Sequence, residues 1–307
     1  MYLRLCNIGC YLVWFSWAAC LPQGVGAEPV AGQQGVASAA GPMVARVMSF
    51  NIRYNNPQDG PNAWPHRRDH VAAIVRSQDV DIAGLQEALR DQIADLQERL
   101  PEYQWYGVGR DDGQQQGEFV PIFYRADRWT VRAQGNFWLS QQPDQPGRRD
   151  WGAACARMVT WLELEHKPSG KRLVVLNTHF DHQSAEARRE GAGLLLRRLG
   201  DYSQSPVVVT GDLNCDPSSE PYRILTGTLS RSQDGLHLQD SFSMAELGHI
   251  GPQSTWNGFR AIVPDRRIDF VLVAGPIGVR QHRILPAERE GRFASDHLPV
   301  LAELTLP

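Results

Sequence analysis

Hydrophobic positions in the chain follow two periods, one typical of strands and one typical of helices. Apolar residues at helical spacing predict helices over residues 66–77, 91–100 and 184–199. Short apolar runs predict strands over residues 44–52, 81–86, 119–124, 158–164, 172–178, 207–210, 267–273 and 298–306. No internal repeat is apparent, and the alternation of strands and helices predicts a layered α/β domain.

The first residues have the pattern of a secretory signal peptide. Arg4 precedes an apolar run, Ile8–Leu21, which is followed by the small residues Val25, Gly26 and Ala27. The run is shorter than the roughly 20 residues that span a bilayer. We therefore expect cleavage after residue 27, no stable membrane span after processing, and a periplasmic or extracellular protein. A membrane anchor and a lipoprotein, the latter modified at Cys20, are the alternatives.

The rest of the chain divides into a linker and one domain. Residues 28–43 are rich in Gly, Ala and Gln without an apolar period, which predicts a flexible linker. Residues 44–307 form the expected domain. With 42% hydrophobic and 21% charged residues, the composition is that of a globular protein. The net charge of −3 argues against a broadly basic surface for long nucleic acid, although a local basic cleft stays compatible with it. We expect a monomer.

Polar residues gather where the predicted strands end. Any one of them alone is more often a turn former or a structural residue, but several at strand ends indicate a site, because α/β folds assemble sites there. The segments are Ser49–Asn51, Gln86–Glu87, Asn177–His179, Gly211–Asn214, Ile268–Phe270 and Ser295–Pro299.

These segments carry the chemistry of phosphoester hydrolysis. Hard oxygen donors suit Mg²⁺ or Mn²⁺ better than zinc. His179 and His297 are able to donate protons or hydrogen bonds to a phosphoryl group near neutral pH. A metal-dependent hydrolase combines these groups. The motifs of serine hydrolases, papain-like proteases and nucleotide-binding loops do not occur. The oxygen donors are Asn51, Glu87, Asp212, Asn214 and Asp296.

The ordered series of motifs resembles the endonuclease/exonuclease/phosphatase superfamily. A QE pair followed by GDLN and SDH, between Met48 and Pro299, carries the resemblance. It is similar to secreted bacterial members that resemble the deadenylase-like branch. The resemblance implies a DNase I-like fold: a four-layer α/β sandwich of two packed mixed β-sheets flanked by helices. It also implies a divalent-metal-dependent phosphoester hydrolase of the phosphodiesterase or nuclease type. A phosphatase or phospholipase C-like enzyme acting on a small or lipid phosphoester is the alternative, and a binding module that kept the fold is a third.

The resemblance also assigns residues to the metal and to the nucleophile. Asn51 and Glu87 match the metal-binding Asn and Glu of the superfamily, and Asp296 resembles a further metal ligand or histidine partner. Asp212 matches the aspartate that activates the attacking water. The implied cofactor is Mg²⁺ or Mn²⁺.

Three further residues match groups that contact the phosphate, and a fourth matches the group that orients one of them. Asn214 matches the asparagine that orients a phosphate oxygen, and His179 matches the phosphate-binding or general-acid histidine of many branches. His297 matches the histidine that contacts the scissile phosphate. Asp269 matches the aspartate that orients this histidine. The implied partner is a phosphoester substrate, with nucleic acid among the alternatives.

Residues outside the superfamily motifs are candidates for substrate binding because of their positions near the predicted strand ends and loops. Long irregular stretches, 107–118 and 140–152, are also candidates for function. Cys155 and Cys215, each beside a proposed functional residue, permit one disulfide or two free thiols. The substrate-binding candidates are Arg67, Arg68, Tyr124, Arg157, Asp181 and His182.

Overall fold

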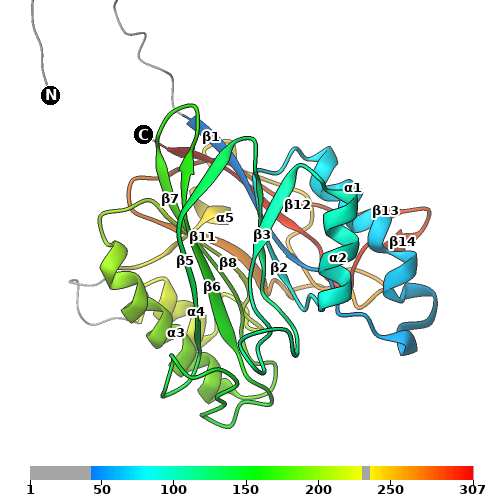
Figure 1. Cartoon of the computed structure of the whole chain (residues 1–307), viewed down its shortest axis with the longest axis horizontal. Coiled ribbons are helices and arrows are strands. Elements are labelled where there is room, and N and C mark those ends of the chain that lie inside the picture. The colour runs from blue at the N-terminus through cyan, green and yellow to red at the C-terminus, as the bar shows by residue number, and fades with distance from the viewer. Residues whose placement is uncertain (1–42, 230–235, 307) are drawn as a thin grey trace, which may run out of the picture. The chain divides into compact units, whose positions relative to one another are not determined.

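The computed structural model describes residues 43–229 and 236–306, and within them two mixed β-sheets pack face to face (Figure 1). The first sheet has the strand order β10 (His249–Ile250), β12 (Gly278–Ile284), β15 (Val300–Leu306), β1 (Met43–Asn51), β2 (Ile82–Gln86), β4 (Ile122–Arg125) and β3 (Tyr103–Tyr106). The second has the order β5 (Trp129–Trp138), β6 (Met158–His166), β7 (Arg172–His179), β8 (Val207–Asp212), β11 (Asp269–Ala274) and β9 (Gln239–Asp240). A hairpin joins β13 (Glu288–Arg289) and β14 (Arg292–Phe293).

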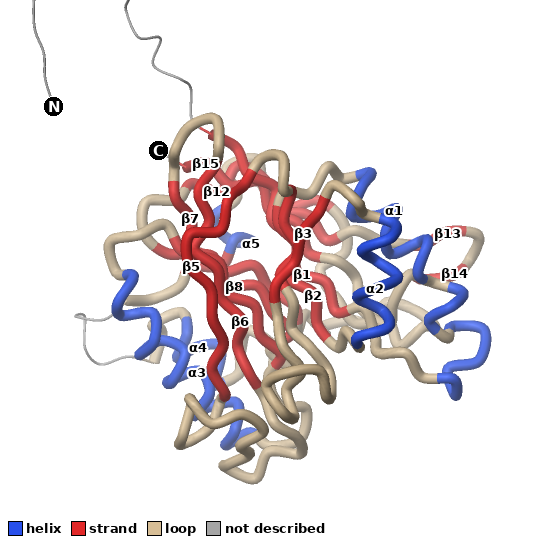
Figure 2. The backbone as a smooth tube through the Cα atoms, viewed as in Figure 1, coloured by secondary structure: helices blue, strands red, loops and turns tan. Residues whose placement is uncertain are grey.

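Helices cover the outer faces of both sheets (Figure 2). The first sheet is covered by α1 (Arg68–Ser77) and α2 (Arg90–Arg99), and the second by α3 (Ala185–Leu199) and α4 (Glu220–Leu225). The order helix, sheet, sheet, helix is the predicted four-layer α/β sandwich, and the prediction is confirmed. The shorter helices are α5 (Ser241–Met244), η1 (Pro57–Asn62), η2 (Trp64–His66) and η3 (Gly200–Tyr202).

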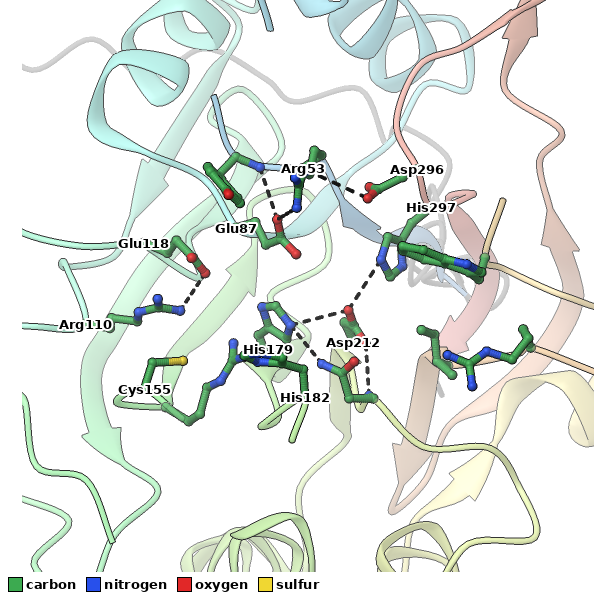
Figure 3. A pocket seen from close by; sticks show the side chains of 16 residues that line it. Arg53, Glu87, Arg110, Glu118, Cys155, His179, His182, Asp212, Asp296 and His297 are labelled. Carbon is green, nitrogen blue, oxygen red and sulfur yellow. Dashed lines mark hydrogen bonds and ion pairs between the residues drawn. The ribbon is translucent and has the colours of Figure 1, made fainter. Parts of the chain in front are cut away.

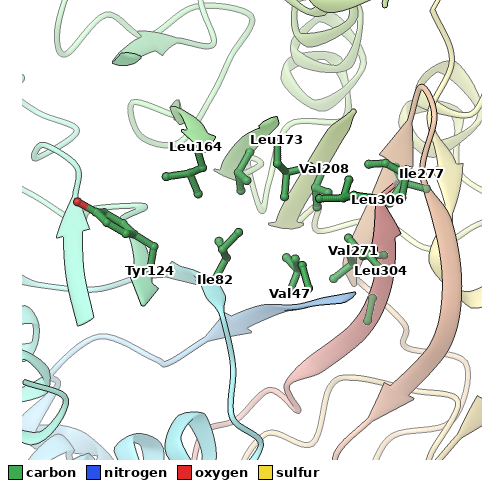
Figure 4. Close-up of a cluster of buried hydrophobic side chains, with 14 of the residues drawn as sticks. Val47, Ile82, Tyr124, Leu164, Leu173, Val208, Val271, Ile277, Leu304 and Leu306 are labelled. Atoms are coloured by element: carbon green, nitrogen blue, oxygen red, sulfur yellow. The ribbon is translucent and has the colours of Figure 1, made fainter. Parts of the chain in front are cut away.

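The central core lies between the two sheets (Figure 4). Val47 and Ile82 of the first sheet face Leu173 and Val208 of the second. The next residue along β1, Met48, points the other way and packs in the cluster beneath α1 and α2. Both faces of the central strands are therefore buried, which explains why they appear in the sequence as continuous apolar runs.

The eight predicted strands and three predicted helices are all present, with ends shifted by a few residues, but three longer strands were missed. One is β5, an edge strand in which exposed polar residues such as Arg132 alternate with residues on the sheet's inner face. The second is β12, which contains a register shift between Val279 and Gln281. The third, β3, has only four residues. Strands of this kind lack the continuous apolar run on which the prediction relied.

Two predictions about the N-terminus fall outside the described residues. The signal peptide at 1–27 lies there entirely, and the linker at 28–43 does so except for its last residue. Across 43–229 and 236–306, no helix is both long and apolar enough to cross a bilayer.

A buried polar seam joins the two sheets beside the strand ends. Asn177 of β7 accepts a hydrogen bond from Gln86 Nε2 of β2 (2.6 Å) and one from Thr210 Oγ1 (3.0 Å). Its own amide donates across the interface to the carbonyl oxygen of Leu85 (2.7 Å). Gly84 makes this approach possible, because a Cβ there would lie 2.7 Å from the Asn177 oxygen. These bonds fix the position of one sheet relative to the other.

Candidate active site

Strand ends from both sheets meet around one pocket of about 460 Å³ (Figure 3). The first sheet contributes the residues that end β1 and follow β2, and the second contributes the ends of β7 and β8 and the start of β11. In the second sheet, β8 lies between β7 and β11. The strand register places Asp212 of β8 between His179 of β7 on one side and Asp269 of β11 on the other. The predicted residues at these strand ends, together with His297, are Asn51, Glu87, His179, Asp212 and Asp269.

Asn51 links carboxylates from the two sheets. Its Nδ2 donates to Glu87 Oε1 (3.0 Å) and to Asp212 Oδ2 (2.9 Å). Its Oδ1 accepts the main-chain N–H of Arg53 (3.0 Å), which fixes the orientation of the amide. The structure therefore turns the amide hydrogens of Asn51 toward the carboxylates, and its oxygen toward the main chain. In this arrangement Asn51 positions the two carboxylates, and its role as a metal ligand stays a prediction.

His297 and Asp269 form a buried pair. Nδ1 of His297 donates to Asp269 Oδ2 (2.9 Å), and its Nε2 lies 3.7 Å from Asp212 Oδ2. The rings of His297 and Trp256 also form a T-shaped pair, with their centroids 4.8 Å apart. Burial alone would lower the pKa of His297, but the carboxylates of Asp269 and Asp212 outweigh it and raise this pKa well above its usual range. His297 is therefore an imidazolium at neutral pH.

Asp212 is buried at the centre of the pocket. Burial, together with the charge of Asp269, raises the pKa of Asp212 to about 6. Its Oδ1 accepts the main-chain N–H of Asn214 (2.9 Å). A carboxylate with this pKa is able to take a proton from a water molecule near neutral pH.

His179 differs from His297 in its charge. Its Nε2 accepts a hydrogen bond from Asn214 Nδ2 (3.0 Å), so the neutral ring carries its proton on Nδ1. Burial and the neighbouring Arg157 lower the pKa of His179 well below its usual range. Nδ1 has no hydrogen-bond partner among the described residues. One pocket thus holds a neutral and a charged histidine on either side of Asp212 (Figure 3).

Arg157 brings an incompletely bonded guanidinium to the pocket. Its side chain is only 5% exposed, and its Nη2 donates to His182 Nδ1 (2.9 Å). Nε lies 3.6 Å from Asp181 Oδ2. Neither Nε nor Nη1 makes a hydrogen bond to any part of the chain that the structure describes. Buried guanidinium N–H groups without partners are costly, which favours an anionic ligand here.

Asp181 lies behind Arg157 and does not line the pocket. It accepts the main-chain N–H groups of Ala154 (2.9 Å), Gln183 (3.0 Å) and Ser184 (2.8 Å). Asp181 therefore shapes the start of α3 and holds Arg157 from the rear, while His182 lines the pocket itself.

Three of the predicted substrate-binding residues point elsewhere. Arg67 is buried and donates to the carbonyl oxygens of Ile52 (2.8 Å) and Ala294 (2.7 Å). Arg68 forms an ion pair with Asp95 of α2 (3.0 Å). The ring of Tyr124 lies in the core between the sheets. The structure places none of these three in the pocket, because each has a partner within the fold.

Several residues that line the pocket were not predicted from the sequence. Glu118 bonds to Arg110 Nη1 (2.6 Å), and burial raises the pKa of Glu118. Both lie in the 107–118 stretch, whose length was the only signal of function. Arg53 lies two residues after Asn51, and nothing in its sequence context indicated a functional role. The lining residues absent from the prediction are Arg53, Tyr54, Arg110, Glu118, Trp256, Arg266 and Ile268.

The two cysteines of the domain are separate free thiols. Cys155 lines the pocket, whereas Cys215 is buried and lines an adjoining hollow. Burial raises the pKa of Cys155, and raises that of Cys215 to about 12. Neither thiol therefore has the character of a nucleophile at neutral pH.

The oxygen donors of the pocket fit a divalent cation. The Arg53 guanidinium lies 3.8 Å from Glu87 Oε2 and 4.0 Å from Asp296 Oδ2, so this side of the pocket already accommodates positive charge. Asp59 holds Arg53 there through two hydrogen bonds (3.0 and 3.2 Å). Asp212, Asp269 and His297 form a second group whose ligand atoms lie within 4.8 Å of one another. Carboxylate oxygens are the donors that Mg²⁺ and Mn²⁺ prefer.

Comparison with known proteins defines the class. The profile of the endonuclease/exonuclease/phosphatase family matches residues 48–297, and the chain belongs to this family. The family consists of metal-dependent hydrolases of phosphoesters, and its members typically use divalent metals.

Particular solved structures are similar over nearly the whole domain. An endonuclease/exonuclease/phosphatase from Bacteroides vulgatus is 39% identical, with a TM-score of 0.81; the match covers 86% of this chain and 100% of that one. A mannosyl-6-phosphatase from Bacteroides thetaiotaomicron is 32% identical, with a TM-score of 0.78, covering 85% and 100%. The catalytic domain of human Nocturnin shares the fold at 20% identity, with a TM-score of 0.66, covering 86% and 94%.

Proposed function

We propose that the protein is a divalent-metal-dependent hydrolase that releases phosphate from a small, polar phosphoester. One observation carries the proposal: buried Arg157, with N–H groups left unpaired, shares a pocket with Asp212 and with a neutral and a charged histidine. An anion at Arg157 would lie beside a base and a proton-bearing imidazolium, which is the arrangement that phosphoryl hydrolysis needs.

Each group has a distinct task in this proposal. Asp212 takes a proton from the attacking water, and its pKa suits it to this role near neutral pH. His297, held by Asp269, donates a hydrogen bond to a phosphoryl oxygen and stabilises the charge that grows there. Arg157 binds a second oxygen of the phosphoryl group. When bound, a divalent metal supplies further positive charge at the phosphoryl oxygens, and Glu87 and Asp296 are the residues that would hold it.

The shape and charge of the pocket support a small substrate over a long strand. Four arginines and four carboxylates line the pocket, and two of these carboxylates, Glu87 and Asp296, are the proposed metal ligands. With a divalent metal bound, the pocket would carry a net positive charge, as suits one phosphate group. The similarity to a mannosyl-6-phosphatase supports the same choice. Hydrolysis of nucleic acid is the second candidate, since Tyr54 and Trp256 on the pocket wall offer rings for stacking with bases.

We also propose that the protein is exported, from the signal peptide pattern at residues 1–27. The mature protein would then start at Glu28. N-terminal sequencing of the protein purified from the periplasm or medium tests this. A chain that keeps its first residues and remains with the membrane would favour the anchor instead.

A substrate panel tests the activity. Sugar phosphates, bis-p-nitrophenyl phosphate, single-stranded DNA and RNA, and sphingomyelin would be assayed with EDTA, Mg²⁺ or Mn²⁺. We expect phosphate release from sugar phosphates with added metal, and none with EDTA. Asp212→Asn should abolish it, whereas the control Asp216→Asn, which changes a carboxylate outside this pocket, should not. Preferred hydrolysis of oligonucleotides would contradict the proposed substrate, and full activity in EDTA would contradict the metal.

A further inference from the structure

The pocket continues into a second hollow that the proposed reaction does not use. This hollow has a volume of about 420 Å³ and shares Arg110 and Cys155 with the pocket. Its walls come from the two long loops, 107–118 and 140–152, and from the residues just before β6. Arg149 and Gly147 belong to the second loop.

The second hollow lies on the leaving-group side. A phosphoryl group is attacked in line, so the leaving oxygen points away from the water that Asp212 activates. Figure 3 shows Arg110 and Cys155 on one side of His179, with Asp212 and His297 on the other. The alcohol part of a substrate bound at Asp212 would therefore extend past Arg110 and Cys155.

Arg149 is the arginine of this hollow that has no carboxylate partner among the described residues. Arg110 pairs with Glu118 (2.6 Å), and its Nε lies 3.8 Å from Asp111, the carboxylate that lines the hollow. Arg149 donates only to the carbonyl oxygen of Ala154 (3.0 Å), and it has no carboxylate partner in the described part of the chain. Its neighbour Arg148, by contrast, is paired with Asp150 (3.1 Å) and lines neither hollow.

A hollow on the opposite side is a poorer place for an anion. It shares Asn214 and Arg266 with the pocket and therefore adjoins the side from which water attacks. Its walls carry two carboxylates, Asp216 and Glu220, which balance its two arginines, Arg188 and Arg266. The hollow at Arg149 has one carboxylate, Asp111, for two arginines.

We propose that the hollow at Arg149 is a subsite for a second negative group, a carboxylate or a second phosphate, on the leaving alcohol of the substrate. The proposal rests on the proposed function and narrows its substrate class to phosphoesters with two anionic groups. Arg149 is the specificity-determining residue, because it forms no ion pair with a carboxylate of the described residues. A guanidinium suits both anions through paired hydrogen bonds.

Two matched pairs of substrates test the subsite. Glucitol 6-phosphate and 6-phosphogluconate have the same scissile phosphate and differ in a carboxylate at the far end. Glycerol 1-phosphate and 3-phosphoglycerate form a shorter pair. At low ionic strength, we expect kcat/KM to favour the anionic member of at least one pair by about tenfold, as for a charge-assisted hydrogen bond.

Variants then assign this preference to Arg149. Arg149→Gln should reduce the preference to about twofold or less, through a higher KM for the anionic substrate. Arg148→Gln removes the same charge one residue away and should leave the preference intact. Equal kcat/KM within both pairs, or equal losses in the two variants, would overturn the subsite while leaving the phosphatase activity established. Failure to hydrolyse any of the four substrates, with oligonucleotides cleaved instead, would overturn the proposed function itself.

Discussion

The buried pair of His297 and Asp269 allows a prediction about the pH dependence of activity. Asp269→Asn keeps the size of the side chain and its ability to accept a hydrogen bond, but removes the charge. In the structure this charge lies next to the imidazole, with Nδ1 and Oδ2 2.9 Å apart and both residues buried. It is the main influence that opposes the lowering of the His297 pKa by burial. The variant should therefore lower the pKa of His297.

The size of the effect follows from the distance. Two charges about 4 Å apart interact by about 4 kcal/mol at an effective dielectric constant of about 20, which is equivalent to about 3 pKa units. Asp212 keeps part of this influence in the variant, because its Oδ2 lies 3.7 Å from His297 Nε2. We expect the alkaline limb of kcat/KM to move to lower pH by between about 1 and 3 units.

The assay is a pH profile of kcat/KM between about pH 5 and pH 9 with saturating metal. Asp265→Asn, an equivalent change at an exposed position, is the control and should leave the limb in place. His297→Ala should lower kcat by about 10²–10⁴-fold, and the double variant should resemble it, since paired residues act as a unit. An unmoved alkaline limb in Asp269→Asn, or losses that add in the double variant, would refute the reasoning.

Four further expectations concern the metal, the fold and the thiols. Glu87→Gln should raise the Mg²⁺ concentration needed for half-maximal activity by about tenfold or more, because it removes a hard charged ligand. His282 is buried, which lowers its pKa to about 3. As the pH falls below about 6.5, the unfolded chain takes up a proton at His282 that the folded chain does not, so the free energy of unfolding decreases. Between pH 6.5 and pH 4, the free energy of unfolding, measured with urea, should therefore decrease by about 3 kcal/mol less in His282→Leu than in the wild type. Gly84→Ala should lower the free energy of unfolding by about 1–3 kcal/mol by forcing the polar seam apart. Mass spectrometry without reduction should find Cys155 and Cys215 as two thiols, and a mass lower by two hydrogens would contradict the structure.

The strand-end residues were predictable because the sequence specifies both their chemistry and their location. Each lies at one end or the other of an apolar run, and strand direction then brings these ends together at one edge. Asp212 ends β8 and Asp269 begins β11, so antiparallel pairing places them opposite each other. The resemblance to a known family supplied the pairing of the two sheets, which apolar runs alone do not determine.

The arginines were less predictable because a long side chain takes its direction from partners that the sequence does not reveal. Arg67 turns inward, where carbonyl oxygens at Ile52 and Ala294 need donors. Arg157 turns to the pocket, because Asp181 holds it from behind. Nothing in the local sequence of either residue distinguishes these outcomes.

The polar seam between the sheets has a consequence for how activity appears during folding. Asn177 of the second sheet meets Gln86 and the carbonyl oxygen of Leu85 in the first only after the two sheets have docked. Glu87 follows β2 of one sheet and Asp212 ends β8 of the other, so a chain in which a single sheet has formed has only part of the site. Recovery of activity on refolding should therefore coincide with the docking of the sheets. A chain in which only one of the two sheets has formed should be inactive.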